Sequence, residues 1–510
     1  MTQEELFKKL VAHCKEYGFI FPSSEIYDGL GAVYDYGQNG VELKNNIKRY
    51  WWDSMVKLHE NIVGIDAAIF MHPRTWEASG HVSAFNDPLI DNKDSKKRYR
   101  ADVLIEEWIA KQDEKIEKEV EKARKRFGES FDEEKYRATS PRVAETAARR
   151  DEVHARFAEA MNANDLGGLR QIILDCEIAC PISGTRNWTE VRQFNLMFST
   201  QMGSTAEGAN TIYLRPETAQ GIFVNFLNVQ KTGRMKLPFG IAQIGKAFRN
   251  EINPRNFTFR SREFTQMEME FFCDGEEGME WFEYWKQQRI NYYKNKLKFS
   301  DDFFRIYVHE KLAHYAKAAI DIEVKFPFGW GELEGVHHRG TWDLTRHSEF
   351  SGEDLQYMDH DNSRKLMPTV IETSVGLDRT MLALLCRAYD EEKAATAKEG
   401  MDEDTRVVLH LPPLVAPIQV AVLPLSKKLK EPAYALYKEI DRHFRCEYDE
   451  TGSVGKRYRR QDEIGTPFSV TFDFDSANDN AVTVRNRDTM EQERVNVTQL
   501  RDYLEKQIEA

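Results

Sequence analysis

The sequence has little of the residues that mark several classes of protein. Its 510 residues include only 6 Cys, 16 Pro and 29 Gly. The cysteines are too far apart to build a disulfide framework or a zinc knuckle of paired CxxC motifs. The nearest two are Cys176 and Cys180, which we interpret as small buried residues. The low Gly and Pro contents also exclude a collagen-like or low-complexity chain.

Long apolar runs and targeting signals are also missing. No uninterrupted apolar stretch approaches the length of about 18 residues that a bilayer-spanning helix needs. Residues 1–13 mix both charge signs with helically spaced Leu6, Leu10 and Val11, unlike a signal or transit peptide. We therefore expect a cytoplasmic protein that has no membrane association.

Two common phosphate-binding motifs are absent, the Gly-x-x-x-x-Gly-Lys-Ser/Thr loop and the Gly-x-Gly-x-x-Gly fingerprint. Any bound phosphate must then be held by side chains, above all by arginine. The chain has 41% hydrophobic and 30% charged residues, as expected for a globular protein. Its length of 510 residues suits two to four domains. Its net charge of −13 argues against binding nucleic acid through the whole surface.

Residues 111–160 are unusually rich in charge, with opposite charges four positions apart, as in Glu114 with Lys118 and Glu121 with Lys125. This pattern is typical of exposed helix. We interpret it as a helical insertion that projects from a core domain, with an RNA-contacting arm as the alternative. Residues 40–58 have a helical apolar stripe that includes Trp51, which predicts a long core or interface helix.

The central third of the chain has the sequence pattern of β-strands. Apolar segments are interrupted by Gly and Pro, and residues 264–271 alternate so that Glu268 and Glu270 share one strand face. The short turn at 253–256 suits a hairpin, so we expect a mostly antiparallel sheet. After Pro412, Pro413 and Pro417, strand-like and helix-like stretches alternate, which predicts a separate α/β domain of about 95 residues.

This central third also carries more arginine and carboxylate than a structural sheet needs. Long charged side chains are seldom buried unless they are paired or hold a ligand. Arginines suit the oxygens of a triphosphate, and carboxylates suit a metal-bound phosphate or an ammonium group. The set therefore indicates a ligand with charge of both signs.

The order of the motifs resembles the class II aminoacyl-tRNA synthetases, and among them most closely the homodimeric glycyl-tRNA synthetase family. The resemblance covers nearly the whole chain except the charged insertion. It is carried by residues 34–37, 78–81, 99–102, 186–190, 194–198, 214–221, 248–251, 259–270, 372–379 and 459–467. In motif 1, Pro73 lies near the position of the proline that usually closes this motif in class II enzymes.

The resemblance implies an α+β fold, in which an antiparallel catalytic sheet with flanking helices carries a helical insertion and is followed by an α/β anticodon-binding domain. We place the N-terminal part of the catalytic domain, with motif 1, at 1–105 and the insertion at 106–175. The core with motifs 2 and 3 follows at 176–411 and the anticodon-binding domain at 412–510. The implied function is ATP-dependent ligation of glycine to tRNA(Gly) by a homodimer, with Mg²⁺.

The resemblance also implies site residues. Catalytic roles fall to Arg249 on the α-phosphate and Arg379 on the γ-phosphate, and Glu332 is implied as a Mg²⁺ ligand. The implied glycine-binding residues are Arg100, Glu217, Phe264, Thr265, Gln266, Met267, Glu268, Glu372, Thr373, Ser374, Val375 and Gly376. The implied ATP-binding residues are Arg249, Asn250, Glu251, Phe259, Arg260, Ser261, Arg262, Glu263, Phe264, Glu332, Leu333, Gly376, Leu377, Asp378 and Arg379.

Three alternatives stay open. The chain could be a non-catalytic synthetase-like RNA-binding or polymerase accessory subunit, which the presence of Arg249, Glu251 and Arg379 disfavours. It could instead be a class II enzyme for another small amino acid. Residues 455–460, which interleave bases with Tyr458, predict either a clamp for single-stranded RNA or a solvated helix face. His337 and His338 are expected to be structural.

Overall fold

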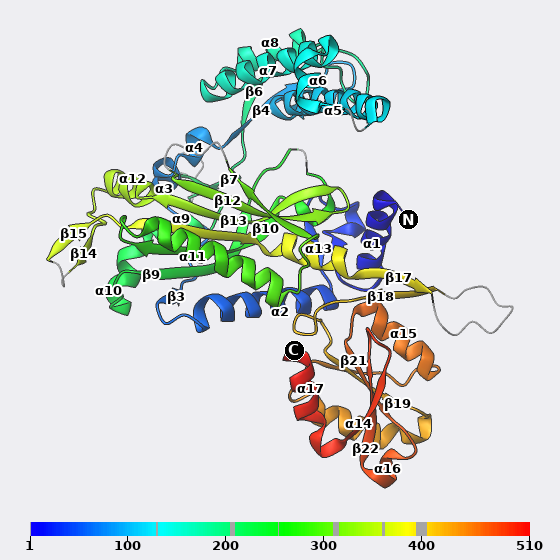
Figure 1. Cartoon of the computed structure of the whole chain (residues 1–510). Helices are drawn as coiled ribbons and strands as arrows, with labels where there is room; N and C mark the ends of the chain where they lie inside the picture. The colour runs from blue at the N-terminus through cyan, green and yellow to red at the C-terminus, as the bar shows by residue number, and fades with distance from the viewer. Residues whose placement is uncertain are drawn as a thin grey trace. The chain divides into compact units, whose positions relative to one another are not determined.

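The computed structural model describes residues 2–128, 131–203, 210–252, 254–309, 316–359, 363–393 and 405–509 (Figure 1). The chain forms two compact units. The first comprises Met1–Ser79, Ser199–Arg249 and Pro254–Ala510, and the second Gly80–Phe198 with Asn250–Asn253. Among the described residues, no helix has the length and apolar character that a membrane span requires.

A seven-stranded sheet forms the centre of the first unit, with the strand order β11-β12-β13-β16-β10-β9-β3. Every neighbouring pair is antiparallel except β3 with β9, so the expected antiparallel sheet is confirmed. Its strands are β3 (Ile62–Gly64), β9 (Phe239–Phe248), β10 (Glu263–Cys273), β11 (Phe304–Val308), β12 (Ala318–Phe326), β13 (Gly329–Gly340) and β16 (Thr369–Gly376).

One face of this sheet packs against the main hydrophobic core. Helices α2 (Gln38–Trp52), α11 (Gly278–Asn291) and α13 (Leu377–Ala388) bury apolar side chains against Met267, Phe271 and Val375. Trp51 is fully buried in this core. The helix predicted for residues 40–58 is therefore a core helix, although its last turn, Asp53–Lys57, is π-helical.

The opposite face of the sheet is only partly covered by apolar groups. Helices α9 (Ala219–Val224) and α10 (Phe226–Gly233) pack on Phe239 and Phe272 at one end. Beyond that apolar end, β10 presents Gln266, Glu268 and Glu270 on the same face, because alternate residues of a strand point the same way. This polar stretch is where the candidate site lies.

The C-terminal part of the first unit has its own five-stranded sheet, in the order β20-β19-β21-β22-β23, and its own core. Strands β20, β19 and β21 are parallel, and β22 and β23 continue antiparallel. The elements are β19 (Val420–Pro424), α14 (Lys430–Ile440), β20 (Cys446–Tyr448), α15 (Val454–Ile464), β21 (Phe468–Phe472), α16 (Ser476–Asp479), β22 (Ala481–Asn486), β23 (Gln492–Asn496) and α17 (Leu500–Glu509). The predicted α/β domain is confirmed.

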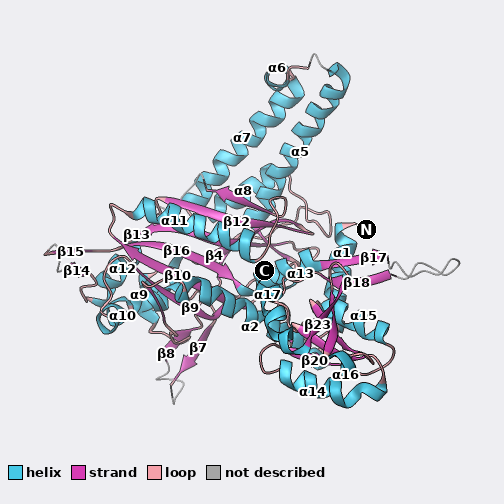
Figure 2. Cartoon of the chain, turned by 60° about the horizontal axis from the view of Figure 1, so that its bottom comes forward, coloured by secondary structure: helices cyan, strands magenta, loops and turns pink. Residues whose placement is uncertain are grey.

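The described part of the second unit combines five α-helices with a small sheet of order β5-β4-β6. Its long helices α5 and α7 pack side by side (Figure 2). Its elements are α4 (His81–Ala84), β4 (Asn86–Asp91), β5 (Arg98–Arg100), α5 (Ala101–Phe127), α6 (Glu133–Thr139), α7 (Pro141–Asn162), α8 (Leu166–Asp175) and β6 (Arg192–Asn195). The unit is wider than the predicted insertion at 106–175, because strands on both sides of the helices fold with them.

The remaining elements of the first unit are short, apart from α1 and α12. They are α1 (Gln3–Glu16), β1 (Ile20–Pro22), β2 (Tyr34–Tyr36), α3 (Pro73–Ala78), β7 (Ser199–Met202), β8 (Asn210–Tyr213), α12 (Trp342–Ser351), β14 (Tyr357–Asp359), β15 (Arg364–Leu366), β17 (Tyr389–Lys393) and β18 (Thr405–Leu409). Of these, α12 matters most for the site, because it packs against α9 and β13.

Candidate active site

The strand register brings the polar residues of β10 and β16 together. Glu268 lies opposite Ser374, and Glu270 lies opposite Glu372. Carboxylate oxygens of Glu268, Glu270 and Glu372 all lie within 4.8 Å of one another. Acidic side chains from sequence segments about a hundred residues apart therefore meet on one small area of the sheet.

Glu268 is a buried carboxyl group in this area. It accepts a hydrogen bond from the hydroxyl of Thr218. Burial raises the pKa of Glu268, and the nearby Glu372 and Glu217 raise it further, because neighbouring negative charges disfavour ionisation. Because the charges of Glu217 and Glu372 both raise the pKa of Glu268, the three carboxylates predicted to bind glycine lie around one region.

Glu372 is held by two cations from β13. His337 Nδ1 lies 2.6 Å from Glu372 Oε1, and Arg339 Nη1 donates to Oε2 at 2.7 Å. Burial would raise the pKa of Glu372, but Arg339 and His337 together lower it to about 2. Burial likewise opposes protonation of His337, yet Asp321 and Glu372 raise its pKa to about 10. Glu372 is thus a fixed anion in the site.

Arg339 also ties this area to α12. Its Nε and Nη2 atoms each donate to Asp343 at 2.8 Å. Gln220 donates to Glu217 at 2.8 Å and to Asp343 at 3.3 Å, so the network continues to α9. The sequence did not predict Arg339 as part of the site. The only available signal was the period-two spacing of His337 and Arg339 on the strand.

Amide and hydroxyl groups line the same face beside Glu268. Gln266 Oε1 accepts a hydrogen bond from the backbone N–H of Thr218 at 3.1 Å, and its Nε2 lies 3.5 Å from Ser374 Oγ. Gln266, Glu268 and Ser374 therefore share a polar surface, and their role in binding glycine stays a prediction.

Other predicted glycine-binding residues point the opposite way. The side chains of Met267 and Val375 lie in the hydrophobic core, and Thr373 shares their strand face. Thr265 is also on that face, and its backbone N–H donates to Asp378 at 2.6 Å. Because successive residues of a strand point to opposite faces, these four residues can offer only backbone atoms to a ligand over Glu268.

Three predicted ATP-binding residues are likewise structural. Leu333 and Leu377 are buried in the core. Asp378 is buried and accepts hydrogen bonds from Lys44 at 2.7 Å and from the hydroxyl of Tyr36. Burial would raise the pKa of Asp378, but Lys44 and these hydrogen bonds lower it. Its carboxylate therefore anchors α13 and is not available to a nucleotide.

The two predicted catalytic arginines each lie against an aromatic ring. Arg249 donates through Nε to Pro216 O at 3.1 Å, and its guanidinium lies 5.3 Å from the centroid of the Phe264 ring. The guanidinium of Arg379 lies 4.4 Å from the centroid of Phe259 and donates through Nε to Phe259 O at 3.0 Å. Planar cations stacked on rings in this way are positioned before any ligand arrives.

Glu332 lies next to Arg379. Its Oε2 is 3.4 Å from Arg379 Nη1, and its side chain is 52% exposed. Gly331 precedes it, where a Cβ atom would lie 2.8 Å from the Phe259 ring, so glycine is needed for the close approach of β13 to that ring. Glu332 thus offers an accessible carboxylate beside the predicted γ-phosphate arginine.

Gly376, another predicted ATP-binding residue, ends β16 opposite Gln266. The hairpin between β9 and β10 holds the remaining predicted ATP-binding residues of the first unit. Arg262 O accepts from Arg249 N at 2.9 Å, and Arg262 Nη1 donates to Gly31 O at 2.8 Å. Glu263 pairs with Lys246 at 2.6 Å. Ser261 donates to Glu263 O, and Arg260 forms a β-bridge with Arg255. The hairpin backbone is therefore well fixed around Arg249 and Phe264.

Three predicted residues belong to the second unit. Arg100 pairs with Asp102 at 2.5 Å and with Asp87 at 3.0 Å. Asn250 donates through its backbone to Leu196 O at 2.7 Å, and Glu251 is buried. Their participation in the site stays a prediction.

The predicted RNA clamp at residues 455–460 is part of helix α15. Arg457 is buried and donates to the backbone oxygens of Glu450 and Gly452. Arg460 is paired with Asp449, and Tyr458 hydrogen-bonds Thr471 at 2.6 Å. These three side chains stabilise the domain, so the proposed clamp is wrong for Arg457, whose guanidinium is buried.

Comparison with known proteins places each of these regions in a family. Residues 87–196 match the family described as glycyl-tRNA synthetase insertion domain 1, residues 199–387 the class II tRNA synthetase core domain (G, H, P, S and T), and residues 419–507 an anticodon binding domain. The chain is 51% identical over 510 residues to a glycine–tRNA ligase of Geobacillus kaustophilus, covering 100% of this chain and 99% of the relative.

The chain belongs to the glycine–tRNA ligase family. A family member from Staphylococcus saprophyticus is 50% identical over 513 residues with full coverage of both chains. Another from Lachnoclostridium phytofermentans is 49% identical over 508 residues, covering 99% of this chain and 100% of the relative. The predicted family and fold class are confirmed, and the accessory-subunit alternative is not supported by any of these relatives.

Proposed function

We propose that this chain ligates glycine to tRNA with ATP as the energy source, and that glycine binds over β10 and β16. The convergence of Glu217, Glu268 and Glu372 beside Gln266 and Ser374 carries this assignment. Glycine offers only an ammonium and a carboxylate for recognition. A buried cluster of carboxylates provides the counter-charge that the ammonium needs.

Selection of glycine needs only steric exclusion. A pocket rejects larger side chains by crowding but rejects smaller ones weakly, and glycine has no smaller competitor. The site is framed by close-packed groups: at Gly335, which pairs with Ser374, an added Cβ atom would lie 2.5 Å from the His337 ring. We therefore expect alanine to be excluded by crowding.

The activation step follows from positioning and electrostatics. The glycine carboxylate attacks the α-phosphorus in line, Arg249 stabilises the charge that develops there, and Arg379 neutralises the departing pyrophosphate. The adenine ring stacks on Phe264. The 3′-terminal ribose hydroxyl of tRNA then attacks the carbonyl carbon of glycyl-adenylate and releases AMP.

The residues around Arg379 fit a Mg²⁺ ion that accompanies ATP. Mg²⁺ is usually held by one or two carboxylates together with substrate phosphates and water, and Glu332 offers one half-exposed carboxylate in that place. We propose Glu332 as its ligand. A bound Mg²⁺ would supply charge neutralisation on the phosphates.

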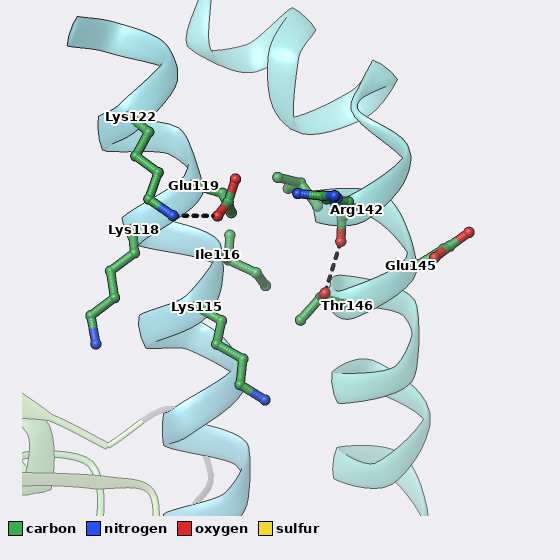
Figure 3. Close-up of a pocket in the computed structure, with 9 residues that line it drawn as sticks. Lys115, Ile116, Lys118, Glu119, Lys122, Arg142, Glu145 and Thr146 are labelled. Carbon is green, nitrogen blue, oxygen red and sulfur yellow. Dashed lines mark hydrogen bonds and ion pairs between the residues drawn. The ribbon is translucent and has the colours of Figure 1, made fainter.

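The insertion offers a candidate contact for the tRNA. A groove of about 370 Å³ between α5 and α7 is lined by Lys115, Lys118, Lys122 and Arg142, with Ile116 at its floor and Glu119 and Glu145 among the lining residues (Figure 3). Lys115, Lys118 and Lys122 follow one face of α5 over two turns. We propose that this row of cations binds RNA phosphates.

Pyrophosphate exchange tests the substrate assignment. The full-length protein should exchange pyrophosphate into ATP with glycine but not with alanine or serine. Glu268→Gln should raise the KM for glycine by about 10- to 100-fold, because it removes a charge-assisted contact, and should leave the KM for ATP unchanged. Exchange with serine alone would overturn the substrate, and lost ATP binding in Glu268→Gln would mean that this residue serves the nucleotide.

A charge reversal tests the groove. The double variant Lys115→Glu/Lys122→Glu should weaken tRNA binding by about tenfold and lower its salt dependence, since phosphate contacts release counterions. The matched control Lys93→Glu/Lys97→Glu changes the same charge at exposed positions between β4 and β5, outside the groove. Equal effects of both variants would exclude a groove-specific contact.

The expected homodimer rests on the resemblance and the expected cytoplasmic location on the sequence pattern, and both remain proposals. Sedimentation equilibrium of the full chain tests the first. A mass of twice 59.4 kDa is the expected result, and a monomer that charges tRNA would contradict it.

A further inference from the structure

Glu270 is the one carboxyl group of the cluster that has no assigned task. Its side chain is fully buried on β10, two residues beyond Glu268 and directly opposite Glu372. Neither of its oxygens has a hydrogen-bond partner among the described residues. A buried ionised carboxylate without a partner is strongly disfavoured, so this group needs an explanation.

Most of the described charges that act on Glu270 are negative. Glu268 and Glu372 flank it on β10 and β16, and Asp343 of α12 adds a further negative charge. The nearest positive group is Arg339 of β13, but its Nε, Nη1 and Nη2 already donate to Asp343 and Glu372. On β9 the opposite residue is Ile241, which is apolar.

We propose that Glu270 is a neutral carboxylic acid in the working enzyme. Its O–H group donates a hydrogen bond to the carboxylate of Glu268 or Glu372 and thereby positions both of them. This inference rests on the proposed function. One carboxylate oxygen of each of the three residues lies within 4.8 Å of the others, so a side-chain rotation of Glu270 can close an O–H···O bond to a neighbouring carboxylate. Glu270 keeps its proton and does not touch the substrate, so it is a positioning residue.

The electrostatics of the cluster support the neutral form. Burial and the charges of Glu372 and Glu268 raise the pKa of Glu270 well above its ordinary value. A neutral Glu270 leaves the ammonium of glycine to Glu217, Glu268 and Glu372 without adding repulsion between them. An ionised Glu270 would lose this hydrogen bond and would repel Glu268 and Glu372, so these carboxylates would no longer be held in place for the ammonium.

Two substitutions of similar size separate these roles in glycine-dependent pyrophosphate exchange. Glu270→Gln keeps a neutral hydrogen-bond donor and should hold the KM for glycine within about twofold of the wild-type value. Glu270→Leu removes the donor and should raise that KM at least tenfold, with an unchanged KM for ATP. A tenfold rise in Glu270→Gln at neutral pH would overturn the proposal, as would a wild-type KM in Glu270→Leu.

The pH dependence of the KM for glycine is a measurement that a purely structural role of Glu270 would not change. The KM for glycine of the wild type should rise at alkaline pH as Glu270 loses its proton, and Glu270→Gln should lack this component. Glu268, Glu372, His337, Arg339 and Asp343 are present in both proteins, so the difference between them reports Glu270. Identical profiles would overturn the proposal, and this comparison stands even where Glu270→Leu fails to fold.

An infrared difference spectrum separates this inference from the proposed function. At neutral pH the spectrum of the wild type minus that of Glu270→Gln should contain the C=O stretch of a protonated carboxyl group. Its absence overturns the neutral Glu270 whether or not the enzyme uses glycine. A wild type that shows this band but no glycine-dependent exchange would overturn the proposed function alone.

Discussion

The catalytic sheet and the helices of the second unit are both rich in charge, but they use it differently. In the first unit, the Arg289 and Glu334 side chains are 2% and 0% exposed and joined at 2.6 Å. On α5, Lys118 and Glu114 are 70% and 66% exposed. Burial makes each charge depend on its partner, whereas exposed charges are solvated and screened. Composition alone does not separate these two situations.

The largest expected effect comes from breaking the buried pair. Arg289→Met leaves Glu334 without its guanidinium partner, in contact only with the Tyr293 hydroxyl at 2.5 Å, and should destabilise the first unit by about 3–5 kcal/mol. Urea denaturation followed by tryptophan fluorescence measures this. The control Lys118→Met should cost about 0.5 kcal/mol or less. Similar losses in the two variants would remove the distinction between the regions.

A smaller loss of stability is expected when the ion pair between His337 and Glu372 is broken, and this loss should depend on pH. His337 has a pKa raised from 6.5 to about 10, so its contribution is complete below pH 6.5 and is lost as the pH rises through 10. Glu372, with a pKa lowered from 4.5 to about 2, contributes above pH 4.5 and loses its contribution as the pH falls through 2. The ion pair between His337 and Glu372 therefore contributes most to stability between about pH 4.5 and pH 6.5.

His337→Gln should thus lower stability by about 1.5–3 kcal/mol at pH 6 and by progressively less toward pH 10. Denaturation midpoints of the two proteins at pH 6, 8 and 10 measure the difference. His154→Gln, on an exposed position of α7, serves as the control and should change little at any of these values. A constant difference for His337→Gln would exclude the ion pair as its cause.

The smallest effect is expected in the second unit. Arg137 joins Glu117 and Glu133 at 2.8 Å each, in a largely exposed network. Arg137→Met should destabilise the protein by about 1 kcal/mol or less, and 0.5 M NaCl should reduce that loss, because salt screens exposed charges. The loss in Arg289→Met should survive the same salt. A salt-resistant loss at Arg137 would show that this network behaves as a buried one.

Much of the architecture could be predicted from the sequence because it depends on local patterns. The alternation around Glu268 and the short turn at 253–256 predicted the hairpin of β9 and β10. The same alternation could have shown that Met267 and Val375 point away from Glu268. Their inclusion followed from treating contiguous segments as one binding unit, which ignores the two faces of a strand.

Other features depend on contacts between distant segments. Arg339 and His337 reach Glu372 only because β13 pairs with β16. No local sequence pattern predicts that pairing. The burial of Arg457 in the C-terminal domain was hidden for the same reason. Its Nη1 donates to the backbone oxygen of Pro424 at the end of β19, a contact that forms only when the domain has folded.

The sequence by itself determined the family, the order of the domains and the strands that carry the carboxylates, since these follow from motifs and from side-chain periodicity. Only the tertiary structure decided which carboxylates are paired, which have raised or lowered pKa values and which cations lie beside them. The physical reason is that the ionisation of a carboxyl group depends on burial and on charges a few ångströms away in space. Here those charges come from segments that lie far apart along the chain.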